Sequence, residues 1–201
     1  MRRKEGDKAN EILDAAIRVL AKEGFDKAQV SVIAASAGVG TGSIYLYYEG
    51  KEHILRALFG RFWEKLAMDM QSLQQDDPLL RINDQLGLFF DRLVESPDLA
   101  RVYLREHHRF LESQATESLS WYRQCLELGQ SAFREILAAS GRRRSKSSTD
   151  AMRLSQAFLF GGVRSALESW LSGAMSPSLV REHTMNMAMA SILAASERIG
   201  S

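Results

Sequence analysis

The sequence has one cysteine, three prolines and almost no net charge. The shortage of cysteine and the balance of charge each exclude a class of protein. A lone thiol, Cys125, cannot build a disulfide framework or a cysteine-based zinc site, so we interpret it as a small apolar residue of a helix. The 26 basic and 25 acidic residues leave a net charge of +1, so any contact with nucleic acid must come from a local surface. The 201 residues, 45% of them hydrophobic, are enough to bury a sizeable core.

Long apolar runs are also missing. No stretch approaches the length of a membrane-spanning helix. The first residues, Met1-Arg2-Arg3-Lys4-Glu5, lack the apolar segment of a secretion signal. We therefore expect a cytoplasmic protein with no membrane partner.

Helical periodicity dominates the rest of the chain. Ile12, Ala16, Val19 and Leu20 follow the spacing i, i+4, i+7 and i+8, which is typical of one buried helical face. No alternating strand of five or more residues can be found, so the fold class that we expect is all-α, with about nine helices. Beyond the first helices, the pattern predicts helical segments over residues 51–75, 79–95, 97–139, 150–173 and 178–198.

Residues 28–51 carry the pattern that bears on function. A short helix over 30–37 places Val30, Ile33 and Ala34 on one face, and Gly38 suits the left-handed conformation that ends a helix. A second short helix is expected over 41–47. Two short helices joined by a glycine-containing turn form a helix-turn-helix.

The charge pattern favours DNA as the partner of this segment. No acidic residue lies between Lys27 and Glu49, and a helix that enters a DNA groove should avoid carboxylates, which the phosphates repel. Hydroxyl groups can bond phosphates or base edges, Gly42 permits close approach, and Leu46 can meet a thymine methyl group. Free N–H groups and the ammonium of Lys51 at the next helix start suit a phosphate. An ordinary helical corner with exposed hydroxyls accounts for these features equally well.

Four short motifs lie within residues 9–55: Glu23-Gly24-Phe25, Val30-x-x-Ile33-Ala34-x-x-Ala37-Gly38-Val39, Gly42-Ser43-Ile44-Tyr45-x-Tyr47-Tyr48 and Lys51-Glu52. Together they resemble the DNA-binding domain of the tetracycline-repressor (TetR) family. The resemblance implies that Ser43 and Tyr45 face the major groove, and that Tyr47 and Lys51 contact phosphates. The DNA-binding residues that we predict are Gln29, Ser31, Thr41, Gly42, Ser43, Tyr45, Leu46, Tyr47 and Lys51.

The segment also departs from the family pattern. Gly40 replaces the usual capping serine, Thr41 stands where a basic residue is common, and Gln29 stands where threonine or serine usually caps the preceding helix. Fewer basic contacts are therefore available than in the family pattern. The resemblance assigns Ile44 and Tyr48 to the core.

An oxidoreductase is the alternative from another class of protein. Gly38-x-Gly40-x-Gly42 resembles a dinucleotide-binding loop, and Tyr47-x-x-x-Lys51 matches the spacing of the short-chain dehydrogenase pair. Such a loop needs a preceding strand and a parallel sheet, whereas here a helix precedes it. We therefore expect no enzyme and no cofactor, and neither a metal site nor a Ser-His-Asp arrangement can be argued.

Residues 1–51 are predicted to form the three-helix DNA-binding domain, and residues 52–201 a helical ligand-binding and dimerisation domain. The resemblance implies a pocket among the middle helices and a two-fold pairing of the last two helices. An intrachain core and a solvated basic face over 101–109 are the alternatives to these two sites. The ligand-binding residues that we predict are Phe62, Trp63, Leu66, Phe89, Arg105, Arg109, Phe110, Trp121 and Phe158. The dimer-interface residues that we predict are Phe160, Gly161, Gly162, Met185, Met189 and Ile192.

Short motifs also resemble the fatty-acid-degradation (FadR) branch of the family, including Gln29-Val30-Ser31, Ile44-Tyr45-Leu46-Tyr47 and Phe160-Gly161 ahead of Trp170. This branch would imply acyl-CoA as the small-molecule effector. We therefore expect a repressor that binds palindromic double-stranded operator DNA as a homodimer and is released by an apolar or amphipathic ligand. An activator, a regulator without a small ligand and a helical adaptor are the alternatives.

Overall fold

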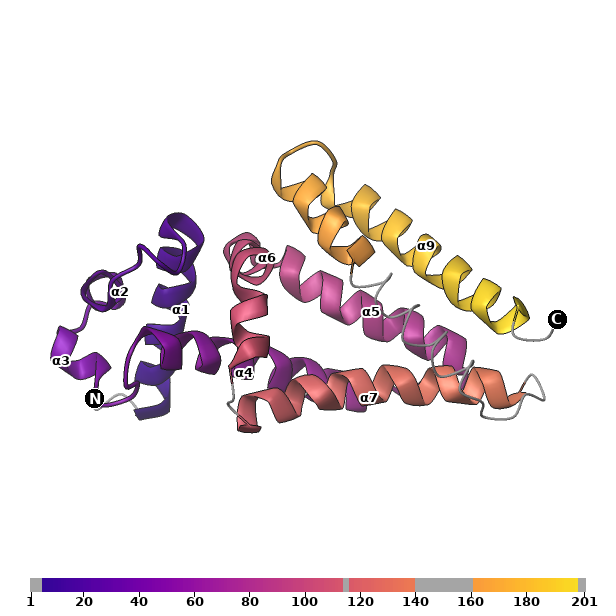
Figure 1. Cartoon of the computed structure of the whole chain (residues 1–201), viewed down its shortest axis with the longest axis horizontal. Coiled ribbons are helices and arrows are strands. Elements are labelled where there is room, and N and C mark those ends of the chain that lie inside the picture. Colours follow the sequence, from indigo (N-terminus) through magenta and orange to yellow (C-terminus); the bar gives the residue numbers. More distant parts are fainter. Residues whose placement is uncertain (1–4, 114–115, 140–160, 199–201) are drawn as a thin grey trace. The chain divides into compact units, whose positions relative to one another are not determined.

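The computed structural model describes residues 5–113, 116–139 and 161–198, and no strand occurs among them. The described chain consists of helices joined by turns and short loops (Figure 1), so the predicted all-α fold class is confirmed. The helices are α1 (Glu5–Glu23), α2 (Val30–Ala37), α3 (Thr41–Ile44), α4 (Lys51–Gln71), α5 (Pro78–Val94), α6 (Pro97–Glu112), α7 (Thr116–Ala139) and α9 (Pro177–Arg198).

The helix boundaries follow from the rare residues of the sequence. All three prolines stand at the first position of a helix, where the missing N–H costs no hydrogen bond. Asp77 caps α5 by accepting hydrogen bonds from the N–H groups of Leu79 and Leu80, at 2.7 and 3.2 Å. Ser96 caps α6 in the same way, accepting from the Leu99 N–H at 3.4 Å.

The chain divides into two compact units. The first contains Met1–Lys65 and Ser96–Tyr122, and the second contains Leu66–Glu95 and Arg123–Ser201. These units are groups of residues that contact one another. The predicted boundary between a DNA-binding domain, residues 1–51, and a ligand-binding domain, residues 52–201, is a functional one and stays a prediction.

In the first unit, α1 buries the face that its periodicity predicts. Ile12, Ala16 and Leu20 are fully buried and Val19 is nearly so. The ion pair between Arg61 and Asp14, at 2.7 Å, joins α4 to the solvent side of α1. Burial of this apolar face stabilises the unit.

In the second unit, α5, α7 and α9 share an apolar core. Ile82, Ala132, Phe133 and Ile192 form its centre. Beside it, Arg181 of α9 donates two hydrogen bonds to the carboxylate of Asp91 in α5, at 2.5 and 2.9 Å. The helices of this unit are therefore joined by both apolar packing and an ion pair.

No helix of the described part of the chain is long and apolar enough to cross a membrane. Within the same residues, no group of three or more His, Cys, Asp or Glu side chains is placed to hold a metal ion.

The thiol of Cys125 in α7 is buried, and its burial raises the pKa from the ordinary 9.0 to about 12. We expect no reaction with a disulfide reagent at pH 8 in the native protein, and reaction of one thiol after unfolding in urea, because the thiolate is the reactive form. Since the folded pKa is raised, the thiol's contribution to stability is complete below pH 9 and is lost as the pH rises toward 12. Rapid labelling without urea would contradict this assignment.

Candidate nucleic-acid interface

Helices α2 and α3 and the turn between them form the predicted helix-turn-helix. Gly38 ends α2 in the left-handed conformation, with φ 68° and ψ 30°, and the next N–H, that of Val39, bonds to Ala34 O at 3.0 Å. The chain reverses at this point and α3 begins at Thr41. Ile33 and Ile44 are fully buried and hold the two helices to the core.

The second helix is shorter than its predicted range of 41–47. Regular helix ends at Ile44, and a turn follows in which the N–H groups of Tyr47 and Tyr48 both bond to Ile44 O, at 3.0 and 2.9 Å. The turn allows the ring of Tyr48 to enter the core, where its hydroxyl donates to Ala9 O at 3.1 Å. Sequence periodicity could not locate this end, because the turn is fixed by a partner 39 residues away.

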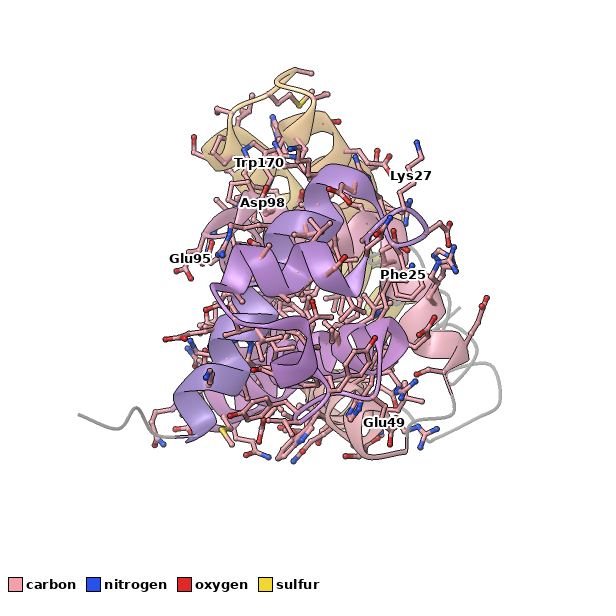
Figure 2. The ribbon with its side chains drawn as sticks, turned by 90° about the vertical axis from the view of Figure 1, so that its left-hand side faces the viewer. Phe25, Lys27, Glu49, Glu95, Asp98 and Trp170 are labelled. Carbon is pink, nitrogen blue, oxygen red and sulfur yellow. The ribbon has the colours of Figure 1, made fainter. Side chains whose placement is uncertain are left out.

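The outer side of α3 and of this turn is exposed and uncharged. Tyr45 is 57% exposed and Leu46 is 81% exposed, and a Cβ added to Gly42 would meet no described atom within 4 Å. The segment without acids runs between Lys27 and Glu49, which Figure 2 labels. The other predicted DNA contacts divide by exposure: Gln29, Ser31 and Thr41 are exposed, and Ser43, Tyr47 and Lys51 are partly buried.

The ammonium of Lys51 has partners within the protein. Its Nζ donates to Phe25 O at 2.6 Å and to Asp26 O at 3.3 Å, and it lies 4.5 Å from the centroid of the Phe25 ring. Lys51 therefore fastens the start of α4 to the loop that follows α1. Its contact with a DNA phosphate stays a prediction.

Helix α6 holds the same loop from another direction. The N–H of Phe25 donates to Oε1 of Glu106 at 3.1 Å, and Glu106 is only 6% exposed. Arg109 donates to both carboxylate oxygens of Asp26, at 2.8 and 2.9 Å, and its Nε forms an ion pair at 3.1 Å with Glu106 rather than an aligned hydrogen bond. We call residues 24–28, with these partners, the Phe25 corner.

Two arginines that the sequence assigns to an effector have partners at the Phe25 corner and at the end of α1. Arg105 donates to Ala21 O at 2.8 Å, and Arg109 is engaged by Asp26 and Glu106, so both arginines connect α6 to α1 and its following loop. Sequence reasoning missed Glu106. An acidic residue among the basic residues of this helix could have been noticed in the sequence. Its hydrogen bond to a backbone N–H 81 residues away has no signal in the sequence.

The aromatic residues predicted to line a pocket form part of a packed cluster in the first unit. Phe62 and Trp63 are buried with ring centroids 4.9 Å apart, and Phe110 lies 5.2 Å from Phe59. Of the remaining predicted ligand contacts, Leu66 and Phe89 are buried in the second unit, Trp121 is partly exposed, and Phe158 lies outside the described residues.

The predicted dimer residues also differ in exposure. Ile192 is 1% exposed and packs into the core of its own chain, and Met185 is 6% exposed. The large apolar side chains that the described part of α9 leaves exposed are instead Leu179, at 43%, Met187, at 69%, and Leu193, at 44%. Of the other predicted interface residues, Gly161 and Gly162 are exposed, Met189 is partly buried, and Phe160 lies outside the described residues.

Residues 12–58, which include α2, its turn and α3, match the family model of the bacterial regulatory proteins of the tetR family. The chain is a transcriptional regulator of the TetR family. It is 29% identical over 177 residues to the fatty acid metabolism regulator protein of Bacillus subtilis, a match that covers 85% of this chain and 87% of that protein. A match to the transcriptional repressor KstR of Mycolicibacterium smegmatis, at 28% identity, covers 49% of this chain and 50% of that protein.

Solved structures of other TetR-family regulators share the fold of this one. The fatty acid degradation regulator FadR from Bacillus halodurans gives a TM-score of 0.75 at 24% identity, covering 93% of this chain and 97% of its own. FadR from Bacillus subtilis, in complex with stearoyl-CoA, gives a TM-score of 0.71 at 22% identity, and the match covers 90% of this chain and 98% of that chain. The relatives are transcription regulators and not enzymes, which removes the oxidoreductase alternative.

Two glycines of this TetR-family regulator give a matched pair of variants. Gly38→Ala is expected to cost about 1–2 kcal/mol of folding free energy, because φ is +68° and an alanine is strained there whatever the space. Gly42→Ala lies within α3 at an ordinary φ, and it should stabilise the helix by about 0.5–1 kcal/mol. The Gly42 variant should nevertheless bind DNA more weakly, if Gly42 contacts DNA as the sequence predicts, since its methyl group would then stand between α3 and the DNA.

Urea unfolding and operator titration of both variants measure these effects. Equal stability of the two variants would contradict the left-handed cap at Gly38. Unchanged operator affinity of Gly42→Ala would remove Gly42 from the DNA contact.

Proposed function

We propose that this TetR-family regulator is a repressor that binds a palindromic operator as a homodimer and releases it when an amphipathic ligand, fatty acyl-CoA, binds. The observation that carries the proposal is the uncharged, exposed face of α3 and its following turn, presented by a helix-turn-helix. Two relatives support the ligand class: a fatty acid metabolism regulator aligned over most of both chains, and a FadR structure that contains stearoyl-CoA.

For DNA recognition, we assign base contacts to the side chains on the exposed face. Tyr45 and Ser43 would reach base edges in the major groove, and Leu46 would meet a thymine methyl group. Tyr47 and the start of α4 at Lys51 would position the domain on phosphates, since phosphate contacts orient a protein but carry no sequence information. Gln29, Ser31 and Thr41 are exposed around this face and complete the proposed contact surface.

A homodimer would place two such faces in successive major grooves of a palindrome. Its interface needs apolar side chains that the single chain leaves uncovered, and α9 offers Met187 and Leu193. Exposed Gly161 and Gly162 would let helices approach closely. Met185 and Ile192 have almost no surface left to bury against a second copy, so we assign them to the core of the protomer.

The Phe25 corner suggests how the ligand would act on DNA binding. Glu106 and Arg109 of α6 hold the loop whose carbonyl oxygens also bind Lys51, the first residue of α4. A ligand that favours another position of these helices would alter the placement of the DNA-binding helices. By linkage, operator DNA would weaken ligand binding by the same factor.

The test is selection from random duplex DNA with the purified protein, followed by anisotropy titration of the selected sequence at several salt concentrations. We expect a palindrome, one dimer per site and an affinity that falls as salt rises. Stearoyl-CoA should then release the complex. A selected palindrome that stearoyl-CoA leaves bound would remove the acyl-CoA effector, and absence of enrichment at low salt would favour the helical adaptor.

A further inference from the structure

One buried polar side chain in the second unit lacks a hydrogen-bond partner. Gln85 of α5 is 3% exposed, and its Oε1 accepts no hydrogen bond. Its neighbours one turn away on the same face, Ile82 and Phe89, are buried hydrophobic residues. Glu106, the other buried polar residue among those described, has the Phe25 N–H and Arg109 as partners.

An unpaired amide oxygen in an apolar core is destabilising, because it has lost its water without gaining a donor. A methionine at this position of α5 would occupy a similar volume without that cost. A sequence that keeps such a group against the requirements of packing usually does so at a functional site. The amide of Gln85 is therefore better explained by a ligand than by the fold.

The helix position that faces the amide carries no side chain. Gly129 of α7 faces Gln85: a Cβ added to this glycine would lie 3.9 Å from Gln85 Oε1, and no other atom of the described residues, apart from the helix's own backbone, falls within 4 Å. At this point α7 thus presents a bare backbone to the amide. One hydrogen-bond acceptor thus lies beside the backbone of Gly129, between helices whose other buried residues are mostly apolar.

We propose that Gln85 is the polar anchor of the effector site, where its Oε1 accepts a hydrogen bond from an N–H or O–H donor of the ligand beside Gly129. This inference rests on the proposed ligand-responsive function. In an acyl-CoA the donor would be an N–H or O–H group of the CoA moiety, such as an amide N–H of the pantetheine arm, and in a hydroxylated acyl chain it would be the hydroxyl group. An apolar ligand without a donor would leave the oxygen as it is in the free protein.

Thermal unfolding of the ligand-free protein is the first test. Gln85→Met removes the unpaired acceptor and should raise the melting temperature by about 2–4 °C. The same replacement at the exposed Gln71, at the end of α4, is the matched control and should leave the melting temperature unchanged. A fall on replacing Gln85 would mean that its oxygen has a partner in solution, and the inference would be overturned.

Ligand binding is the second test, with stearoyl-CoA and 12-hydroxystearoyl-CoA as probes and operator affinity as the check that Gln85→Met is competent. We expect this variant to bind at least one probe about tenfold more weakly than the wild type. Weaker binding of both probes would place the donor in the CoA moiety that they share, and weaker binding of the hydroxylated probe alone would identify the hydroxyl group of the acyl chain. Equal affinities of variant and wild type for both probes would overturn the role of Gln85 and leave the acyl-CoA effector standing. Failure of the wild type to bind either probe would overturn both.

Discussion

Replacing Tyr45 with alanine is expected to weaken operator binding by about 1–3 kcal/mol, the usual effect of losing one base contact. The side chain is 57% exposed and follows α3 on its uncharged face, so the protein itself uses little of the ring. The free energy of unfolding should therefore change by no more than about 0.5 kcal/mol. Anisotropy titration of operator DNA and urea unfolding measure the two quantities.

Tyr48→Phe is the matched control for this prediction. Tyr48 is 7% exposed and its hydroxyl donates to Ala9 O, so losing that hydroxyl should cost about 0.5–1.5 kcal/mol of stability. Operator affinity of the folded variant should stay as it is in the wild type. If Tyr45→Ala lowers stability and Tyr48→Phe lowers affinity, the face assigned to DNA is wrong.

Glu106→Ala should cause a large loss of stability, about 1–3 kcal/mol, because it leaves the buried N–H of Phe25 without an acceptor. It should also weaken operator binding, since the freed loop supplies the carbonyl oxygens that hold Lys51. Chemical unfolding measures the first effect, and operator titration at a temperature where the variant is folded measures the second.

Two further variants of α6 separate the causes. Glu106→Gln keeps an oxygen for the Phe25 N–H but loses the charge that faces Arg109, so its cost should be smaller than that of alanine. Glu112→Ala removes an exposed carboxylate of the same helix and should be neutral within about 0.5 kcal/mol. If Glu106→Ala and Glu112→Ala behave alike, the Phe25 corner does not stabilise the DNA-binding helices.

The local features of the fold could be predicted because short-range rules determine them. Gly38 ends a helix because glycine adopts a positive φ, and Pro78 and Pro97 begin helices because their φ is fixed and they lack an N–H. The spacing of Ile12, Ala16 and Leu20 marks a face that any core would bury. Each of these signals lies within a few residues of the feature that it predicts.

Features that depend on distant partners could not be predicted. Periodicity shows that Met185 and Ile192 share an apolar stripe, but not that the same chain covers it. Arg105 and Arg109 are residue types that bind anions, which is why the sequence assigns them to a ligand. Their acceptors within the protein, Ala21 O and Asp26, lie more than 80 residues away and could not be predicted. The DNA-binding roles of single residues stay predictions for a similar reason, because they depend on a partner molecule.

The absence of charged residues from 28–48 affects the balance between specific binding to the operator and non-specific binding to other DNA. Attraction to arbitrary DNA comes almost entirely from cations that displace counterions, and residues 28–48 contain none. This segment would therefore add little to the binding of random sequence, and its contribution to discrimination would depend on the fit of Tyr45 and Leu46 to particular base pairs.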